Sequence, residues 1–278
     1  MVYVNRTSDD GALIGRDLPD LSANRLGWAL RTARDLGFSG IHATIRRHGF
    51  RETAHFIGRN LRHIIAHRIA LAWDQRHGVD TAGSIQLDGL TIKGPNRKFG
   101  NECVCTSPQS FEFMTRFLPK DLHDYTFVDF GAGKGRTLLL AGRNGFRKII
   151  GVEFAGELVK CATGNIAHYK NAAQKCRDIQ VIEADAVEFV LPDGPLVIYF
   201  YNPFTREVFD SVMRNVVRSL KADRRDCYVV YGSSSADAID WAGPAILATG
   251  CFTQVSTPPM PFFFDAVRTI RFGVFRLH

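Results

Sequence analysis

The sequence predicts an α/β protein with a doubly wound sheet and a C-terminal antiparallel hairpin, preceded by an N-terminal helical region. From residue 125 onward, short apolar runs alternate with stretches of helical spacing, which is typical of buried parallel strands joined by crossover helices. Before residue 100 such runs are absent, and apolar side chains recur at helical spacing instead. We therefore expect an N-terminal helical region with a linker at 1–100, and the α/β domain at 101–278.

Each element of the α/β domain is predicted from its own run. The five runs suited to parallel strands are YTFVDF (125–130), KIIGVEF (148–154), DIQVIEAD (178–185), PLVIYFY (195–201) and DCYVVYG (226–232). Helices are expected between them at about 135–144, 156–174 and 205–221. After the last helix, CFTQVST (251–257) and TIRFGVFRL (269–277) indicate the antiparallel hairpin.

Two helices are expected in the N-terminal region, at about 22–36 and 52–76. The apolar stripe of the second consists of Ile57, Leu61, Ile64, Ile65, Ile69, Ala72 and Trp73. Segment 77–102 is rich in Gly, Asp, Asn and Pro, so we expect a loop there. Ser107 and Pro108 then supply a hydroxyl N-cap and a proline at the first helical position, which predicts a helix to about Leu118.

Composition limits the class of protein. The 278 residues are 45% hydrophobic and 23% charged, as in a globular protein with a core. The first residues lack the basic and apolar regions of a signal peptide, and no apolar run approaches the roughly 20 residues that span a bilayer. We expect a reduced, cytoplasmic protein. Cys103 and Cys105 lack a second pair at zinc-like spacing, so free thiols are predicted and no metal.

The net charge of +7 is concentrated at residues 41–78, which contain seven arginines and two acidic residues, Glu52 and Asp74. Five of these arginines are candidates for binding RNA, an acidic protein or an anionic membrane surface: Arg46, Arg47, Arg51, Arg59 and Arg62. The alternative is a solvated face of a helix that covers the site. His63 and His67 have metal-ligand spacing, but Ile64 replaces the Glu of a zinc protease motif, so no metal is predicted.

A glycine-rich turn, Gly131-Ala132-Gly133-Lys134-Gly135, follows the first strand and precedes a helix. Glycines there let the backbone approach a ligand closely. A P-loop is excluded, because Gly135 stands where Ser or Thr is required and Val128 where glycine is required. A dinucleotide site stays open, since Glu153 ends the next strand 18 residues after Gly135.

Acidic residues end three consecutive strands, and parallel strands bind ligands outside their carboxyl ends. Asp129 lies two residues before Gly131, where it would repel a pyrophosphate but suit a cofactor with a cationic amino-acid group. Glu153 suits ribose hydroxyls, and Asp185 suits an adenine amine. Together the three acids favour a sulfonium nucleoside over a nicotinamide dinucleotide.

Residues 125–204 resemble the core of the class I S-adenosylmethionine-dependent methyltransferases, which have a seven-stranded, Rossmann-like fold. VDFGAGKGR is similar to their first motif, GVEF to the ribose-binding strand end, EADA to the adenine-binding one, and YNPF to the motif facing the methyl acceptor. Within this class, the sequences of these motifs are most similar to those of bacterial methyltransferase-domain proteins and small protein lysine methyltransferases. The resemblance implies S-adenosyl-L-methionine as cofactor, bound by Asp129, Gly131, Gly133, Gly135, Glu153 and Asp185, with Thr106 and Ser107 closing over it.

The resemblance also assigns the methyl-acceptor site to Asn202, Pro203 and Phe204. In amino-methylating members, the Asn side chain and the next backbone carbonyl accept hydrogen bonds from the target nitrogen, and the aromatic residue packs on it. Those members usually carry a second proline where Phe204 stands, and a simple turn at Asn202-Pro203 is the alternative. A lysine acceptor would need about 4 kcal/mol for deprotonation near pH 7.4, unless aromatic surroundings such as Tyr199, Phe200, Tyr201 and Phe204 lowered its pKa.

The sequence thus predicts an S-adenosylmethionine-dependent methyltransferase acting on a nitrogen acceptor, with a protein side chain favoured and RNA next. Two alternatives stay open. One is an NAD(P)-dependent oxidoreductase, for which no Tyr-x-x-x-Lys or catalytic His pattern is evident. The other is a module that binds S-adenosylmethionine without catalysis.

Overall fold

The computed structural model describes residues 50–92, 95–234, 236–261 and 270–278, and side chains in the first helix from Ile64 onward. The helix expected at 22–36 lies outside the described residues. The same holds for the side chains of the five candidate arginines, of His63, and of Ile57 and Leu61.

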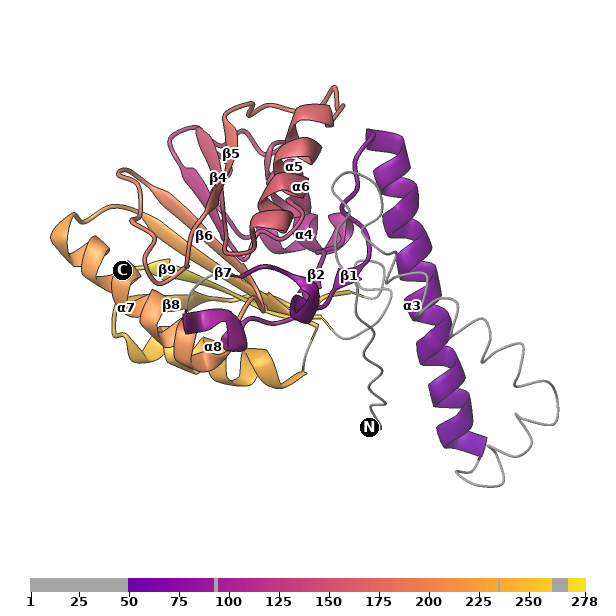
Figure 1. Cartoon of the computed structure of the whole chain (residues 1–278). Coiled ribbons are helices and arrows are strands. Elements are labelled where there is room, and N and C mark those ends of the chain that lie inside the picture. Colours follow the sequence, from indigo (N-terminus) through magenta and orange to yellow (C-terminus); the bar gives the residue numbers. More distant parts are fainter. Residues whose placement is uncertain (1–49, 93–94, 235, 262–269) are drawn as a thin grey trace.

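A single seven-stranded sheet forms the centre of the molecule (Figure 1). Its strands are β3 (Thr126–Phe130), β4 (Lys148–Glu153), β5 (Ile179–Glu183), β6 (Leu196–Tyr201), β7 (Cys227–Ser233), β8 (Phe252–Val255) and β9 (Arg271–Leu277). Their spatial order is β5-β4-β3-β6-β7-β9-β8, and the first five are parallel. The five predicted parallel strands are confirmed, each within two residues of its predicted bounds.

The predicted C-terminal hairpin is confirmed as well. β9 pairs antiparallel with β7 on one side and with β8 on the other, so the last strand is inserted between them. The doubly wound α/β sheet with a closing antiparallel pair is therefore the architecture of this chain.

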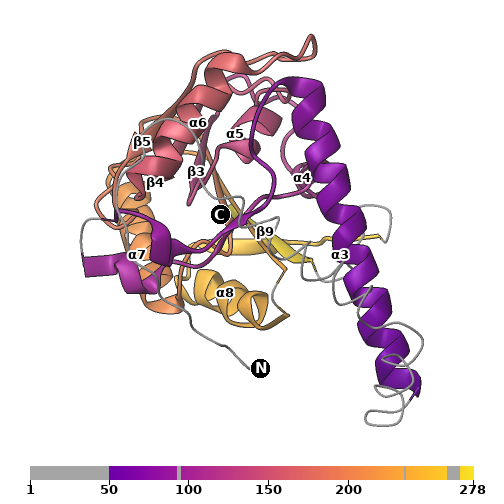
Figure 2. The same ribbon diagram turned by 45° about the vertical axis from the view of Figure 1, so that its right-hand side comes forward.

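Helices cover both faces of the sheet (Figures 1 and 2). The first face carries α4 (Pro108–Thr115), α5 (Arg136–Ala141) and α6 (Gly156–His168), and the second carries α7 (Arg206–Ala222) and α8 (Ala236–Ala248). The helix α4 begins as predicted, with Ser107 as N-cap accepting a hydrogen bond from the Ser110 amide at 3.0 Å, but ends three residues before Leu118. Helix α8 was absent from the prediction, because Gly243 and Pro244 interrupt its pattern.

Helix α3 (Phe50–His77) runs along one side of the domain, and its N-terminal part projects beyond the sheet (Figures 1 and 2). Its bounds match the prediction within two residues, but the predicted stripe is wrong in part. Ile65 and Ile69 are 45% and 42% exposed, whereas nearer the end of the helix the Ala70 carbonyl and the Asp74 carboxylate bond Arg136 of the domain. The Trp73 ring stacks on Tyr169, and its centre lies 4.3 Å from that of the tilted His77 ring.

The segment between α3 and α4 is mostly loop, as predicted, with four short elements. These are β1 (Ser84–Ile85), η1 (Leu87–Gly89), η2 (Pro95–Phe99) and β2 (Cys103–Val104), and β1 pairs antiparallel with β2. Leu90 and Ile92 form a small core with Ala155 and Leu158, so packing continues across the boundary expected at residue 100. None of the described helices is long and apolar enough to cross a membrane.

Candidate functional site

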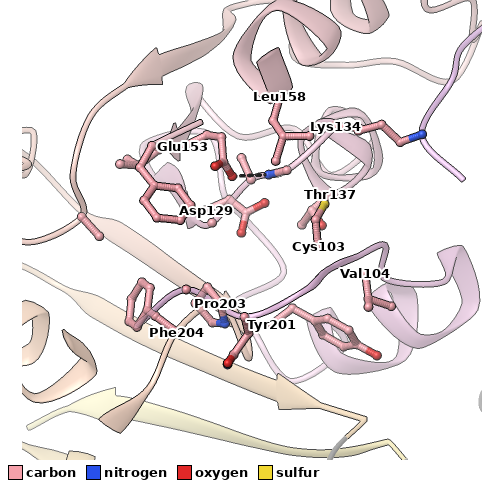
Figure 3. Close-up of a pocket in the computed structure, with 18 of the residues that line it drawn as sticks. Cys103, Val104, Asp129, Lys134, Thr137, Glu153, Leu158, Tyr201, Pro203 and Phe204 are labelled. Atoms are coloured by element: carbon pink, nitrogen blue, oxygen red, sulfur yellow. Dashed lines mark hydrogen bonds between the residues drawn. The ribbon is translucent and has the colours of Figure 1, made fainter. Parts of the chain in front are cut away.

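A pocket opens at the carboxyl ends of the parallel strands, the edge where α/β sheets bind ligands. Figure 3 shows its centre, with the ends of β3 and β4 on one side and the segment after β6 on the other. Two parts of the chain close it. One is the glycine turn after β3, and the other is the segment 96–106 before α4, which we call the strap. The strap contributes Asn96, Gly100, Asn101, Glu102, Cys103, Val104, Cys105 and Thr106 to the lining.

The glycine turn adopts a conformation that only glycine takes readily. Gly131, Gly133 and Gly135 have φ values of 81°, 55° and 83°. A methyl group added at Gly131 would collide with Pro203, and one at Gly133 would lie 2.5 Å from the Cys103 Sγ atom. Gly131 and Gly133 line the pocket, whereas Gly135 packs against Ala162 of α6 and does not. The third glycine therefore serves helix packing.

The amides of the glycine turn are bonded within the protein. The Gly131 and Ala132 amides donate to the Val152 carbonyl at 2.8 and 3.2 Å, and the Gly135 amide donates to the Ala132 carbonyl at 2.9 Å. The Gly133 amide donates to the Glu153 carboxylate at 2.8 Å. The turn thus keeps its shape without a ligand, and these four amides do not point free donors at the pocket.

Asp129 is the penultimate residue of β3, is 2% exposed, and directs its carboxylate into the pocket (Figure 3). Burial, and secondarily the nearby Glu153 carboxylate, raises the pKa of Asp129 well above its usual value. A cationic group in the pocket would favour the ionised carboxylate and reverse part of this effect. The site therefore suits a ligand with a positive charge near Asp129.

Glu153 ends β4 and is 4% exposed. Its Oε2 atom accepts from the Gly133 amide, and its Oε1 atom accepts from the Ala155 amide at 3.0 Å. Burial raises the pKa of this carboxyl, while these amide bonds oppose the shift. Glu153 lines the pocket, so it both fixes the glycine turn and leaves lone pairs for a ligand.

Asp185 follows β5 and lines the pocket beside the strap. Its Oδ1 atom accepts from the Val187 amide at 2.9 Å, and its Oδ2 atom accepts from the Asn96 amide group of the strap at 2.7 Å. Phe154, Leu158, Ala184, Ala186 and Val208 add apolar walls. The three predicted acids are thereby brought to one pocket.

The segment after β6 meets the strap. The Asn101 backbone amide donates to the Pro203 carbonyl at 3.0 Å, and its Nδ2 atom donates to the Asn202 carbonyl at 3.0 Å and to Asn202 Oδ1 at 3.3 Å. Tyr231 also donates its hydroxyl to Asn202 Oδ1, at 3.2 Å. Asn202 has φ 48° and does not line the pocket, whereas Pro203 and Phe204 do.

The remaining predicted residues have mixed positions. Thr106 lines the pocket but is 1% exposed and bonds the Tyr199 hydroxyl at 3.2 Å. Ser107 caps α4 and does not line the pocket. Tyr199 and Phe200 are fully buried in the core, so of the four predicted aromatic residues Tyr201 and Phe204 line the pocket.

Metal ligation has no support among the described residues. No group of three His, Cys, Asp or Glu side chains there could hold an ion. The described cysteines are free thiols, and burial raises the pKa of Cys103 to about 12, so it is a neutral thiol against the glycine turn.

Sequence reasoning missed most of the strap and the residue Arg136. Asn96 and Asn101 sit in a stretch whose composition signals only a loop, and their partners lie 89 and 101 positions away. Arg136 was counted only as the end of the glycine motif, yet it lines the pocket and is 2% exposed. Gly100 is a local sign of close backbone approach, because a methyl group there would collide with Leu87 and Phe154.

No protein-family model and no curated protein sequence matches this chain. Solved structures share the fold at low identity. The glycopeptide N-methyltransferase MtfA, complexed with S-adenosyl-L-homocysteine, is 13% identical over 63% of this chain and 92% of its own, with a TM-score of 0.48. The ribosomal protein L11 methylase from Lactobacillus delbrueckii subsp. bulgaricus is 17% identical over 61% and 76%, with a TM-score of 0.41.

A third similar structure is the [4+2]-cyclase SpnF, 13% identical over 54% of this chain and 59% of its own, with a TM-score of 0.41. Likeness at this level concerns the fold alone, and one fold hosts several chemistries. Function has to be argued from the pocket itself.

Proposed function

We propose that this protein is an S-adenosyl-L-methionine-dependent methyltransferase acting on a nitrogen acceptor. The observation that carries the proposal is the meeting of Asp129, Glu153 and Asp185 in one pocket around the turn at Gly131 and Gly133. Each of the three acids suits a different part of the cofactor, namely its amine, its ribose hydroxyls and its adenine amine.

The residues present fit this cofactor. The absence of side chains at Gly131 and Gly133 lets Pro203 and Cys103 approach the turn closely on the pocket wall. Asp129 is buried and has no hydrogen-bond partner among the described contacts, so a ligand ammonium would supply the missing donor and charge. The bound cofactor would supply an electrophilic methyl group on a sulfonium.

Two residues after β6 would position the methyl-accepting nitrogen. We assign the Asn202 side chain and the Pro203 carbonyl as hydrogen-bond acceptors for its N–H groups, with Phe204 packing on the acceptor. Support comes from Asn101, whose own N–H groups already donate to these two oxygens. Such positioning aims the nitrogen lone pair for in-line displacement and is worth up to roughly 7–11 kcal/mol of the barrier. The acceptor has to replace Asn101 at these oxygens.

A protein side chain is the acceptor class that we favour, with RNA second. Sequence-tolerant binding of a single strand uses exposed aromatic rings on which bases stack. Within the described residues, the exposed large apolar side chains are all aliphatic: Ile65, Ile69, Leu71, Val104, Val190 and Leu247. We further propose a cytoplasmic location and contact between the basic N-terminal region and the acceptor.

An NAD(P)-dependent oxidoreductase is less consistent with the turn. A pyrophosphate needs free backbone amides at such a turn, but those of Gly131, Ala132 and Gly133 donate within the protein. Asp129 adds a repulsive carboxylate at the same place. A binding-only module would share the cofactor site and differ only in turnover.

Two measurements test the proposal. Thermal-shift titrations should show stabilisation by S-adenosylmethionine and S-adenosylhomocysteine and none by NADH, and the opposite result contradicts the cofactor assignment. Incubation with methyl-labelled cofactor and a fractionated lysate should then transfer label to protein. Label in RNA would mean that the acceptor is RNA and not a protein side chain. Cofactor binding without label in any fraction would indicate a binding-only module.

A further inference from the structure

Arg136 is the first residue of α5 and directly follows the glycine turn. It is 2% exposed, yet it lines the pocket. Three contacts fix its guanidinium. Its Nε atom donates to Thr81 Oγ1 at 2.6 Å, and its Nη2 atom donates to Asp74 Oδ1 at 2.6 Å and to the Ala70 carbonyl at 3.1 Å. The guanidinium also lies 4.8 Å from the centre of the Trp73 ring.

The Nη1 atom of the same guanidinium is buried and has no hydrogen-bond partner in the part of the chain that the structure describes. The Asp74 carboxylate has no free acceptor position for it, because its two oxygens also accept hydrogen bonds from the Thr81 hydroxyl, the Thr81 amide and the Ala82 amide. Buried donors are rarely left unpaired, so an unpaired one on a residue that lines the pocket makes that residue a candidate for a bond to a ligand.

The charges of the pocket say which kind of ligand group is missing. Glu102, Asp129, Glu153 and Asp185 line it, and Lys134 and Arg136 are its lining cations. Lys134 is committed to Asp80, at 2.7 Å, and its side chain runs away from Asp129 (Figure 3). Arg136 is therefore the lining cation with a buried nitrogen, Nη1, that has no partner among the described residues, and a guanidinium suits a carboxylate.

We propose that Arg136 binds the α-carboxylate of the cofactor's amino-acid end through Nη1, opposite the amine at Asp129. Asp74 and Trp73 of α3 hold the guanidinium, which makes them positioning residues and makes α3 a component of the cofactor site. This inference rests on the proposed function. A purely structural Arg136 would tie α3 to α5 and would be indifferent to the ligand's carboxylate.

Isothermal calorimetry with three ligands tests it. S-adenosylhomocysteine has the carboxylate and the amine, its decarboxylated analogue has only the amine, and 5′-methylthioadenosine has neither. Wild-type protein should prefer S-adenosylhomocysteine over the decarboxylated analogue by roughly 10- to 100-fold, the effect of one charge-assisted hydrogen bond. Arg136→Met should lose this preference while retaining its affinity for 5′-methylthioadenosine within about twofold.

Two further variants complete the design. Asp74→Asn should reduce the preference roughly threefold to tenfold, since it loosens Arg136 without touching the ligand, and it serves in place of Arg136→Met if that variant does not fold. Lys134→Met, the matched control for loss of a lining cation, should keep the wild-type preference. A wild-type protein that binds both ligands equally, or a folded Arg136→Met that still discriminates, overturns the inference. Failure of all three ligands to bind wild-type protein overturns the proposed function instead.

Discussion

On one side of the pocket, Asp129, Glu153 and Asp185 come from three parallel strands that are neighbours in the sheet, whereas on the other side Asn101 meets Asn202 from 101 positions away. We call these the cofactor side and the acceptor side. The cofactor side is built by the sheet itself and holds its shape through backbone bonds to Glu153. The acceptor side is closed by hydrogen bonds between two loops, so a ligand can compete for them.

The largest expected effect concerns the rigidity of the cofactor side. Gly131→Ala should destabilise the protein by roughly 2–4 kcal/mol, because the position has φ 81° and the added methyl meets Pro203. Urea unfolding measures the effect. Gly164→Ala in α6, where the added methyl meets nothing, should leave stability unchanged or raise it by up to about 1 kcal/mol. Equal losses in both variants would mean that the turn is not strained.

The next effect separates binding from stability at Asp129. Asp129→Asn should weaken S-adenosylhomocysteine binding by about 1.5–3 kcal/mol through loss of a charge-assisted hydrogen bond. The ligand-free variant should be more stable than wild type above neutral pH. Because the folded-state pKa is raised, the folded protein binds more protons than the unfolded one, so wild-type stability falls as pH rises from the unfolded pKa to the folded one.

The same shift sets a pH dependence for binding, which calorimetry over a pH series measures. Wild-type affinity should fall as pH decreases through the raised pKa of Asp129, and the Asp129→Asn profile should be flat. Asp178→Asn, an exposed acid before β5, should match wild type. A variant that binds S-adenosylhomocysteine as tightly as wild type would remove Asp129 from the cofactor site.

A smaller effect is expected at Glu153, which has two tasks on the cofactor side. Glu153→Gln replaces one oxygen by an NH₂ group facing a backbone amide, so stability and cofactor affinity should each drop by about 1–2 kcal/mol. Thermal unfolding with and without S-adenosylhomocysteine separates the two losses. The control is Glu183→Gln, the exposed residue paired with Glu153 in the sheet, which should change neither.

The smallest effect tests the acceptor side. Asn101→Ala removes the strap's Nδ2 bonds to Asn202, so an acceptor no longer displaces them. When the methyl acceptor in the lysate is limiting, the rate of labelled methyl transfer should rise roughly twofold to tenfold. This corresponds to the net free energy of one hydrogen bond, about 0.5–1.5 kcal/mol. The strap variant Asn96→Ala, which leaves Asn202 untouched, should show no such rise. Slower transfer by Asn101→Ala would mean that Asn101 assists the acceptor.

The difference between the two sides also explains what the sequence could predict. The strand ends at Asp129, Glu153 and Asp185 follow from local runs and from the rule that parallel strands end at one edge, so that part of the site was predictable. Asn101 and Arg136 acquire their roles from partners 101 and 62 positions away, which no local pattern encodes. Likewise, spacing identified the helix α3 but could not say that Ile65 and Ile69 would be exposed.

Gly135 shows the limit of a motif within the predictable part. Its left-handed φ fits the pattern, and its neighbours Lys134, Arg136 and Thr137 line the pocket. Gly135 itself faces Ala162 instead. A spacing rule gives the backbone conformation of each position, whereas the neighbour that a position faces depends on how α6 packs.

The most direct test of the central claim is a crystal structure of the protein grown with S-adenosylhomocysteine. The ligand should lie in the pocket with its amine within hydrogen-bond distance of Asp129, its ribose hydroxyls at Glu153 and its adenine amine at Asp185. A ligand bound elsewhere, or one in this pocket whose amine and adenine contact neither Asp129 nor Asp185, would contradict the account.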